Sequence, residues 1–146
     1  MRLFIDCEFN SRDGDLISMA LVSEDGKHEF YEVVKLLKPV HEWVAANVYP
    51  VIGDKPELLY TEFQKKLKVF LCKFANIVVV ADYPVDLMHF NRAMETGPGE
   101  WFELQPLTMV IDDALSAKGS KVPHNALEDA RALRLSWLKK EGWLDA

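Results

Sequence analysis

Residues 77–86 read IVVVADYPVD, and this stretch decides the fold class. The run Ile77–Ala81 is apolar and rich in β-branched residues, which is typical of a strand buried at the centre of a sheet. A helix is predicted to follow over 86–94. A buried strand that leads at once into a helix is typical of α/β proteins, so the sequence predicts a sheet covered by helices.

The segments on either side complete a mixed sheet. The predicted strands cover 3–9, 16–23, 29–36, 77–81 and 104–111, and the Glu24-Asp25-Gly26 turn joins the second to the third. The predicted helices cover 41–49, 56–73, 86–94 and 123–140. The sequence contains no repeat and no dividing linker, so we expect one domain over 1–146, of α/β class, with a mixed five-stranded sheet flanked by helices.

The composition is that of an ordinary globular protein, since 49% of the residues are apolar and 27% are charged. The net charge of -6 argues against a surface that grips nucleic acid by charge alone. It does not exclude an enzyme that acts on nucleic acid, because clustered acids that bind divalent cations become locally positive.

No apolar run approaches the roughly 20 residues that span a bilayer, so no membrane contact is expected. Two acids directly follow the short apolar run at the N-terminus, which is unlike a signal peptide, and the expected location is the cytoplasm. The two cysteines, Cys7 and Cys72, lie in no metal-binding spacing and are expected to stay reduced.

The first candidate site residues are Asp6 and Glu8, on either side of Cys7. Side chains alternate along a strand, so both carboxylates emerge on one face and repel each other unless a cation lies between them. About one D-x-E is expected by chance in a chain with 23 acidic residues, and a solvated strand end is the alternative interpretation. Against it, the pair lies between LFI and Phe9, where solvated acids are out of place.

Asp86 is the second candidate, because it follows the buried strand at the turn into a helix. The carboxyl ends of central strands are where ligand-binding acids belong. Taken alone, Asp86 fits better as an N-capping aspartate, which is common at helix starts. Asp82, four residues earlier, competes with it for the same role, and His89 in the following helix is expected to be structural.

His124 and Asp129 are the third candidates, near the start of the last helix. Positions five residues apart lie about 140° apart around a helix and about 7.5 Å apart along it, which is wrong for chelating one ion. The spacing suits a carboxylate on a cavity wall and an imidazole at the first turn that reaches toward the same cavity. The alternatives are a polar loop residue for His124 and dipole complementation for Asp129. Asp129 is followed by the apolar Ala130 and lies near the buried stripe of the helix, which favours the site.

These residues together resemble the DEDDh 3′–5′ exonuclease superfamily, whose ribonuclease H-like fold has this order of strands and helices. The D-x-E of its first motif matches Asp6 and Glu8, and the aspartate of the second matches Asp86 in YPVDLMHF. The H-x4-D of the third motif matches His124 and Asp129 in HNALEDA. The segments IDCEFN, LISMALVSEDG and EWVAANVYP are similar to the short mycobacterial-type 3′–5′ exoribonucleases.

The resemblance implies hydrolysis with two Mg²⁺ ions about 3.5–4 Å apart, for which Mn²⁺ can substitute. Asp6 would bridge the ions, with Glu8 and Asp129 on the side of the nucleophile and Asp86 on the other side through waters. His124 would take a proton from the attacking water as general base. The substrate would be the 3′ end of RNA, the product a nucleoside 5′-monophosphate and the assembly a homodimer.

Recognition of the last nucleotide is the point at which this chain departs from its relatives. Many of them carry threonines and a glycine after the D-x-E, where Phe9-Asn10-Ser11 stands here, and the second motif often has Asn where Asp82 stands. Phe9 and Asn10 are the candidate substrate-binding residues; core packing and a turn are the alternatives. Trp43 and Trp101 could stack on bases, but burial is the expected role of both.

Two other functions stay open. A DNA 3′–5′ exonuclease, such as a proofreading module, would use the same acids, because contacts to the 2′-OH and not the acids distinguish RNA. A non-catalytic binding module on the same fold is disfavoured, since such proteins usually lose one or more of the acids that are all retained here. The absence of a P-loop argues against use of nucleoside triphosphates.

Overall fold

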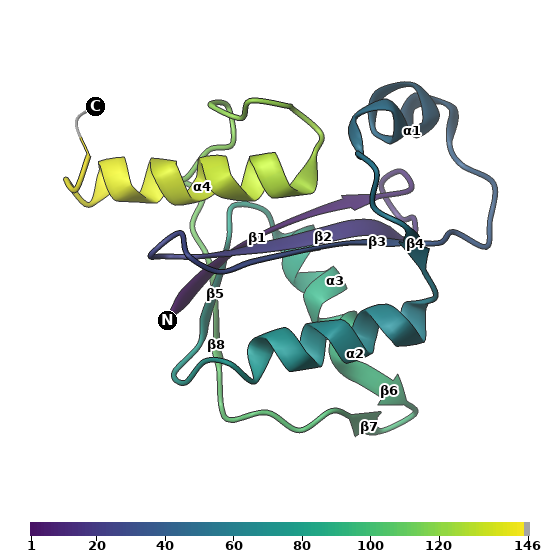
Figure 1. The fold of residues 1–146 in the computed structure, drawn as a ribbon, viewed down its shortest axis with the longest axis horizontal. Helices are drawn as coiled ribbons and strands as arrows, with labels where there is room; N and C mark the ends of the chain where they lie inside the picture. The colour runs from purple at the N-terminus through teal and green to yellow at the C-terminus, as the bar shows by residue number, and fades with distance from the viewer. Residues whose placement is uncertain (145–146) are drawn as a thin grey trace.

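Strand β1 lies inside a six-stranded mixed sheet that helices cover on both faces (Figure 1). The computed structural model describes residues 1–144. The strands of the main sheet are β1 Arg2–Phe9, β2 Leu16–Ser23, β3 Glu29–Val34, β4 Glu57–Leu58, β5 Val78–Ala81 and β8 Thr108–Ile111. A separate hairpin consists of β6 Glu95–Gly97 and β7 Glu100–Trp101. The helices are α1 Glu42–Asn47, α2 Tyr60–Leu71, α3 Pro84–Met94 and α4 Ala126–Lys140, with a 3-10 turn, η1, at Tyr49–Val51.

The strand order along the sheet is β4-β3-β2-β1-β5-β8, and the strand direction changes at β1. β1 is antiparallel to β2 but parallel to β5, which is in turn parallel to β8. The carboxyl ends of these three parallel strands therefore meet at one end of the sheet. In α/β sheets this is the end at which ligands bind.

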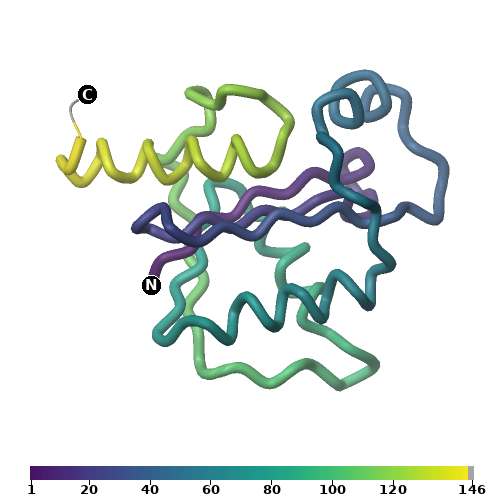
Figure 2. The backbone as a smooth tube through the Cα atoms, in the orientation of Figure 1, coloured from purple at the N-terminus to yellow at the C-terminus, as the bar shows by residue number. Residues whose placement is uncertain are grey.

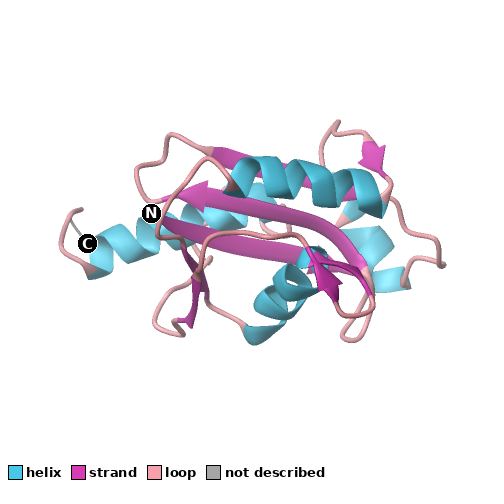
Figure 3. Cartoon of the chain, turned by 90° about the horizontal axis from the view of Figure 1, so that it is seen from below, coloured by secondary structure: helices cyan, strands magenta, loops and turns pink. Residues whose placement is uncertain are grey.

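The two faces of the sheet pack against different helices (Figures 1 and 2). Ile5 belongs to the larger core, which β1 shares with α2 and α3. Phe4 points to the other face, where its ring centroid lies 5.4 Å from that of Trp137 on α4. Because side chains alternate along a strand, Asp6 and Glu8 share the α4 face with Phe4. Figure 3, seen from below, shows the long strands running through the middle of the molecule with helices on both sides.

Helix α4 approaches the sheet closely because small residues face one another there. Ala20 on β2 and Ala126 and Ala130 on α4 are fully buried in one cluster. Ala20 is the register partner of Asp6 in the pairing of β1 with β2. The close packing therefore brings the first turn of α4 next to the acidic end of β1.

The expected α/β class, with a mixed sheet flanked by helices, is confirmed. The sheet has six strands and not five, because Glu57–Leu58, expected in the first turn of a helix, pair with Val33–Val34 at the sheet edge as β4. Helix α2 begins only after this pairing, at Tyr60. The strand expected from 104 begins at Thr108, and the β6–β7 hairpin was not expected.

The last helix begins at Ala126 and not at Pro123. Asn125 caps it, because its side-chain oxygen accepts a hydrogen bond of 3.0 Å from the N–H of Glu128. His124 therefore lies before the helix, although the sequence predicted it within the first turn. Its φ of 71° lies in the left-handed region, which non-glycine residues adopt only when their surroundings hold them there.

Within residues 1–144, no helix has both the length and the apolar character needed to cross a membrane. Cys7 is buried, Cys72 is exposed, and the two are not bonded to each other.

The contact between β1 and α4 predicts a stability effect. Replacing Phe4, which is fully buried, with alanine leaves a cavity beneath Trp137 and should lower the free energy of unfolding by about 3–5 kcal/mol. The control is Val69→Ala on the exposed face of α2, which should change that free energy by no more than about 0.5 kcal/mol. Urea unfolding followed by far-UV circular dichroism measures both, and equal losses in the two variants would contradict the packing described here.

Candidate metal centre

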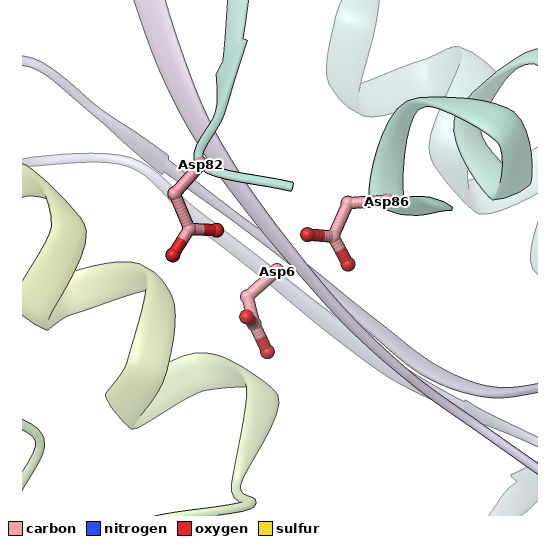
Figure 4. A group of neighbouring side chains, drawn as sticks. All are labelled: Asp6, Asp82 and Asp86. Carbon is pink, nitrogen blue, oxygen red and sulfur yellow. The ribbon is translucent and has the colours of Figure 1, made fainter. Parts of the chain in front are cut away.

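Five carboxylates from four segments converge at the carboxyl end of β1. They are Asp6 and Glu8 on β1, Asp82 after β5, Asp86 in the first turn of α3 and Asp129 in the first turn of α4. They form two groups of three, Asp6 with Asp82 and Asp86, and Asp6 with Glu8 and Asp129. Within each group, one carboxylate oxygen of every residue lies within 4.8 Å of the others. Asp6 belongs to both groups, and Figure 4 shows the first of them, with side chains from β1, the bend after β5 and α3 lying close together.

The pairing of β1 with β5 explains how Asp6 and Asp82 meet. The two strands are parallel, with Phe4 opposite Val80. Continuing this register by two residues brings position 82 level with Asp6, on the same face of the sheet. The sequence separation of 76 residues gave no indication of this match, because the register of a parallel pair depends on the whole sheet.

Asp86 is fixed to β1 and does not cap its own helix. The residue at the N-cap of α3 is Tyr83, and Pro84 is the first residue of the helix. Asp86 is buried, and its Oδ1 accepts a hydrogen bond of 3.1 Å from the backbone N–H of Cys7. The N-capping alternative is therefore wrong, and the hydrogen bond holds the start of α3 against the acidic strand.

Asp129 is held in the same way by the segment before α4. Its Oδ2 accepts a hydrogen bond of 3.2 Å from the backbone N–H of His124. The side chain of His124 is exposed, and its ring packs edge-to-face against the indole of Trp43, with centroids 5.2 Å apart. The imidazole therefore lies at the junction of α1 and α4, attached through its own backbone to a carboxylate of the cluster.

Burial and mutual repulsion make these carboxylates poor acids in the metal-free protein. Burial raises the pKa of Glu8 to about 8, and the neighbouring Asp129 adds to the effect. Burial and then the charge of Asp82 raise the pKa of Asp86 to about 7. The pKa of Asp6 lies well above its usual value, first because of burial and then because of Asp86. Burial also raises the pKa of Asp129.

No positive side chain in the described chain, residues 1–144, forms an ion pair with any of the five acids. The Oδ2 of Asp6 and the Oδ1 of Asp129 are buried and find no hydrogen-bond partner among those residues. Asp129 is only 8% exposed, so solvent does little to compensate it. These residues fit divalent cations, because Mg²⁺ and Mn²⁺ prefer oxygen ligands such as carboxylates. A bound cation would also supply the partner that the buried oxygens lack.

Phe9 and Asn10 make contacts within the protein. The ring of Phe9 stacks on that of His89, with centroids 5.2 Å apart. The amide of Asn10 donates to the carbonyl of Pro39 at 2.9 Å and accepts from the N–H of His41 at 2.8 Å. These hydrogen bonds attach the segment before α1 to the end of β1, and a role of Phe9 and Asn10 in substrate binding stays a prediction.

His89 is buried, and burial lowers its pKa to about 4, so the ring is neutral near pH 7. Together with its stacking on Phe9, this neutrality fits the structural role expected of it.

The expectation that Trp43 and Trp101 are buried is wrong. Trp43 is 51% exposed and Trp101 is 56% exposed. Trp43 lies on the six-residue helix α1, of which only Val44 is buried, so the helix has too small a core face to cover the indole. Trp101 belongs to the β6–β7 hairpin, on the opposite side of the sheet from α4 (Figure 1). Of the two, only Trp43 adjoins the acidic cluster, through His124.

Comparison with known proteins supports the fold. No protein-family model and no curated protein match the chain. Among solved structures, the chain is similar to that of Exonuclease X in complex with 5′ overhanging duplex DNA. The match has a TM-score of 0.57 at 15% identity and covers 99% of this chain and 95% of the other. At this identity the similarity concerns the fold, and it confirms the expected ribonuclease H-like architecture.

The raised pKa values predict that the metal-free protein loses stability as the pH rises. Unfolding returns the carboxyl groups of Glu8 and Asp86 to ordinary pKa values of 4.5 and 3.8, from about 8 and about 7. The folded chain therefore holds these protons more tightly than the unfolded chain, so the free energy of unfolding falls between about pH 5 and about pH 8. Melting temperatures measured in chelator should fall across this range, and added Mg²⁺ or Mn²⁺ should raise them most at the alkaline end.

A matched pair of variants isolates the effect. Glu8→Gln removes one of the titrating groups and should flatten the pH dependence, whereas Glu62→Gln on the exposed face of α2 should leave it unchanged. A melting temperature that rises with pH in chelator would contradict the electrostatic description of the cluster.

Proposed function

We propose that this chain is a divalent-metal-dependent 3′–5′ exonuclease of the DEDDh type, which removes nucleoside 5′-monophosphates from the 3′ end of a nucleic acid. The observation that carries the proposal is the pair of carboxylate triads that share Asp6. Hydrolysis of a phosphodiester with two metal ions needs two adjacent cation sites, and a shared carboxylate is the simplest way to hold both. The similarity in fold to an exonuclease bound to DNA supports a nucleic acid as the substrate.

The roles of the acids follow from their grouping. Asp6 would contact both cations, Glu8 and Asp129 would complete the site next to α4, and Asp86 would act on the side of α3. When bound, two divalent cations neutralise the charge that develops on the attacking and leaving oxygens of a phosphodiester. The hydrogen bonds from Cys7 and His124 to these acids hold the carboxylates in position before any cation arrives.

His124 would act as the proton acceptor at this site. An imidazole nitrogen can accept a proton from water and pass it on, which is the task of a general base. Asp129 accepts a hydrogen bond from the backbone of His124, and the ring of Trp43 packs against its imidazole on one side. The remaining exposed surface of Trp43 is available to stack on a base of the bound strand, and such stacking contributes about 1–3 kcal/mol per base.

RNA is the substrate that we propose, because the segments around the first motif and α1 are similar to short exoribonucleases. The DNA in the neighbouring structure supports the alternative of a DNA exonuclease. A non-catalytic module is disfavoured, because such a module has no use for buried, unpaired carboxylates that destabilise the fold. A homodimer and a cytoplasmic location stay predictions.

Degradation of end-labelled oligonucleotides tests the reaction. With Mg²⁺ or Mn²⁺, a 5′-labelled RNA with a single-stranded 3′ tail should give a ladder that shortens from the 3′ end, and chelator should stop it. A DNA of the same sequence, run in parallel, distinguishes the two substrates by their initial rates. Asp6→Asn should abolish cleavage of both, whereas Asp113→Asn, an exposed acid after β8, should retain it. Full activity of Asp6→Asn, or products cut internally, would refute the proposal.

A second variant tests the proton acceptor. His124→Ala should lower the single-turnover rate by about 10²–10⁴-fold, since that is the usual contribution of a general base. Its affinity for Mn²⁺ should stay close to that of the unmodified chain, because the backbone N–H of residue 124 still supports Asp129. His28→Ala, in the turn between β2 and β3, is the matched control and should keep the full rate. An unchanged rate in His124→Ala would remove the role.

A further inference from the structure

Asp82 is an acid at the centre that the roles proposed above do not use. Its carboxylate lies within 4.8 Å of those of Asp6 and Asp86, and the three side chains come from three different elements (Figure 4). It is half-buried, in the bend between β5 and α3. Burial raises the pKa of this group as it does those of its neighbours.

Asp112 shows what a strand-end acid looks like when it is only a surface residue. Asp112 follows β8 as Asp82 follows β5, and the two strands are adjacent and parallel. The carboxylate of Asp112 accepts from Lys140 Nζ at 2.7 Å and from the N–H of Ala114 at 3.1 Å, which lowers its pKa. No basic side chain in residues 1–144 forms an ion pair with Asp82, and its carboxylate lies beside those of Asp6 and Asp86.

A second observation, in the triad that shares Asp6 with this one, also favours a cation in the cluster. Asp129 is more than nine-tenths buried, and its Oδ1 has no hydrogen-bond partner within the described chain. The buried Oδ2 of Asp6, the residue common to both triads, is likewise without a partner there. Oxygens of this kind are costly in a folded protein unless a ligand satisfies them.

From this arrangement we infer that Asp82 is a direct ligand of the cation held by Asp6 and Asp86, so that the centre has five carboxylate ligands. The inference rests on the proposed function and deepens it. Four ionised carboxylates balance two divalent cations, whereas five leave one negative charge in excess. Asp82 therefore strengthens the binding of cations and weakens the attraction of the loaded centre for a negatively charged phosphodiester.

This inference predicts opposite effects of one substitution on two ligands. Asp82→Asn keeps the size of the side chain and removes its charge. Affinity for the weaker of two bound Mn²⁺ ions should fall by about 10–100-fold, as it does when the groups that order a metal site are lost. At saturating Mn²⁺ the KM for a 3′-tailed oligonucleotide should fall below that of the unmodified chain, because the excess negative charge is gone.

Isothermal titration calorimetry with Mn²⁺ alone, without substrate, measures the first effect. Asp113→Asn is the matched control, since it removes one exposed negative charge close to the same end of the sheet and should change neither affinity nor KM. The rise in melting temperature on addition of Mn²⁺ gives a second measure of binding, and it should be smaller for Asp82→Asn than for Asp113→Asn. Because Asp82→Asn relieves repulsion among buried acids, the variant is expected to fold.

The outcomes separate this inference from the proposed function. Unchanged Mn²⁺ affinity in Asp82→Asn, with two ions bound by the unmodified chain, would overturn the role of Asp82 and leave the nuclease proposal standing. A different result would overturn the proposed reaction and keep Asp82 as a ligand: the unmodified chain binds two ions, Asp82→Asn binds Mn²⁺ more weakly, and no exonuclease activity is found. No binding of Mn²⁺ by the unmodified chain would overturn both.

Discussion

Repulsion among buried carboxylates is the constraint on which the rest of this structure depends. Asp6 lies in contact range of acids from three other segments, and no lysine or arginine within residues 1–144 forms an ion pair with the group. An uncompensated charge in a protein interior is among the most destabilising features that a fold can carry. The core formed by α2, α3 and α4 against the sheet therefore holds the acids together against their repulsion, which bound divalent cations would relieve.

The sheet is built so that these acids meet only when all of it has formed. The antiparallel pairing with β2 places Ala20 beside Asp6, which lets α4 approach closely with Asp129 in its first turn. The parallel pairing with β5 brings Asp82 level with Asp6, and the hydrogen bond from Cys7 holds Asp86. The geometry of the centre therefore follows from backbone pairing and helix packing. Rigid elements of this kind hold a site more accurately than loops do.

Local patterns in the sequence predicted a large part of this arrangement. The alternation of a strand placed Asp6 and Glu8 on one face, and the apolar run before Asp86 identified the buried strand whose carboxyl end faces the site. The spacing of apolar residues predicted the helices, because a helix shows the same period wherever it packs. The α/β class, the mixed sheet and the candidate acids of the first strand, the second motif and the last helix therefore follow from the sequence.

Other features depended on contacts between distant parts of the chain, and only the tertiary structure decided them. The sequence left Asp82 and Asp86 as rivals, whereas the register of β1 with β5 brings both to Asp6. Whether Trp43 is buried depended on how α1 packs, and the packing leaves it half exposed beside His124. By itself the sequence determined which side chains share a strand or helix face, because that periodicity is a local property of the backbone. Strand register and helix docking decided which of those faces meet, because they are set by the packing of the whole core.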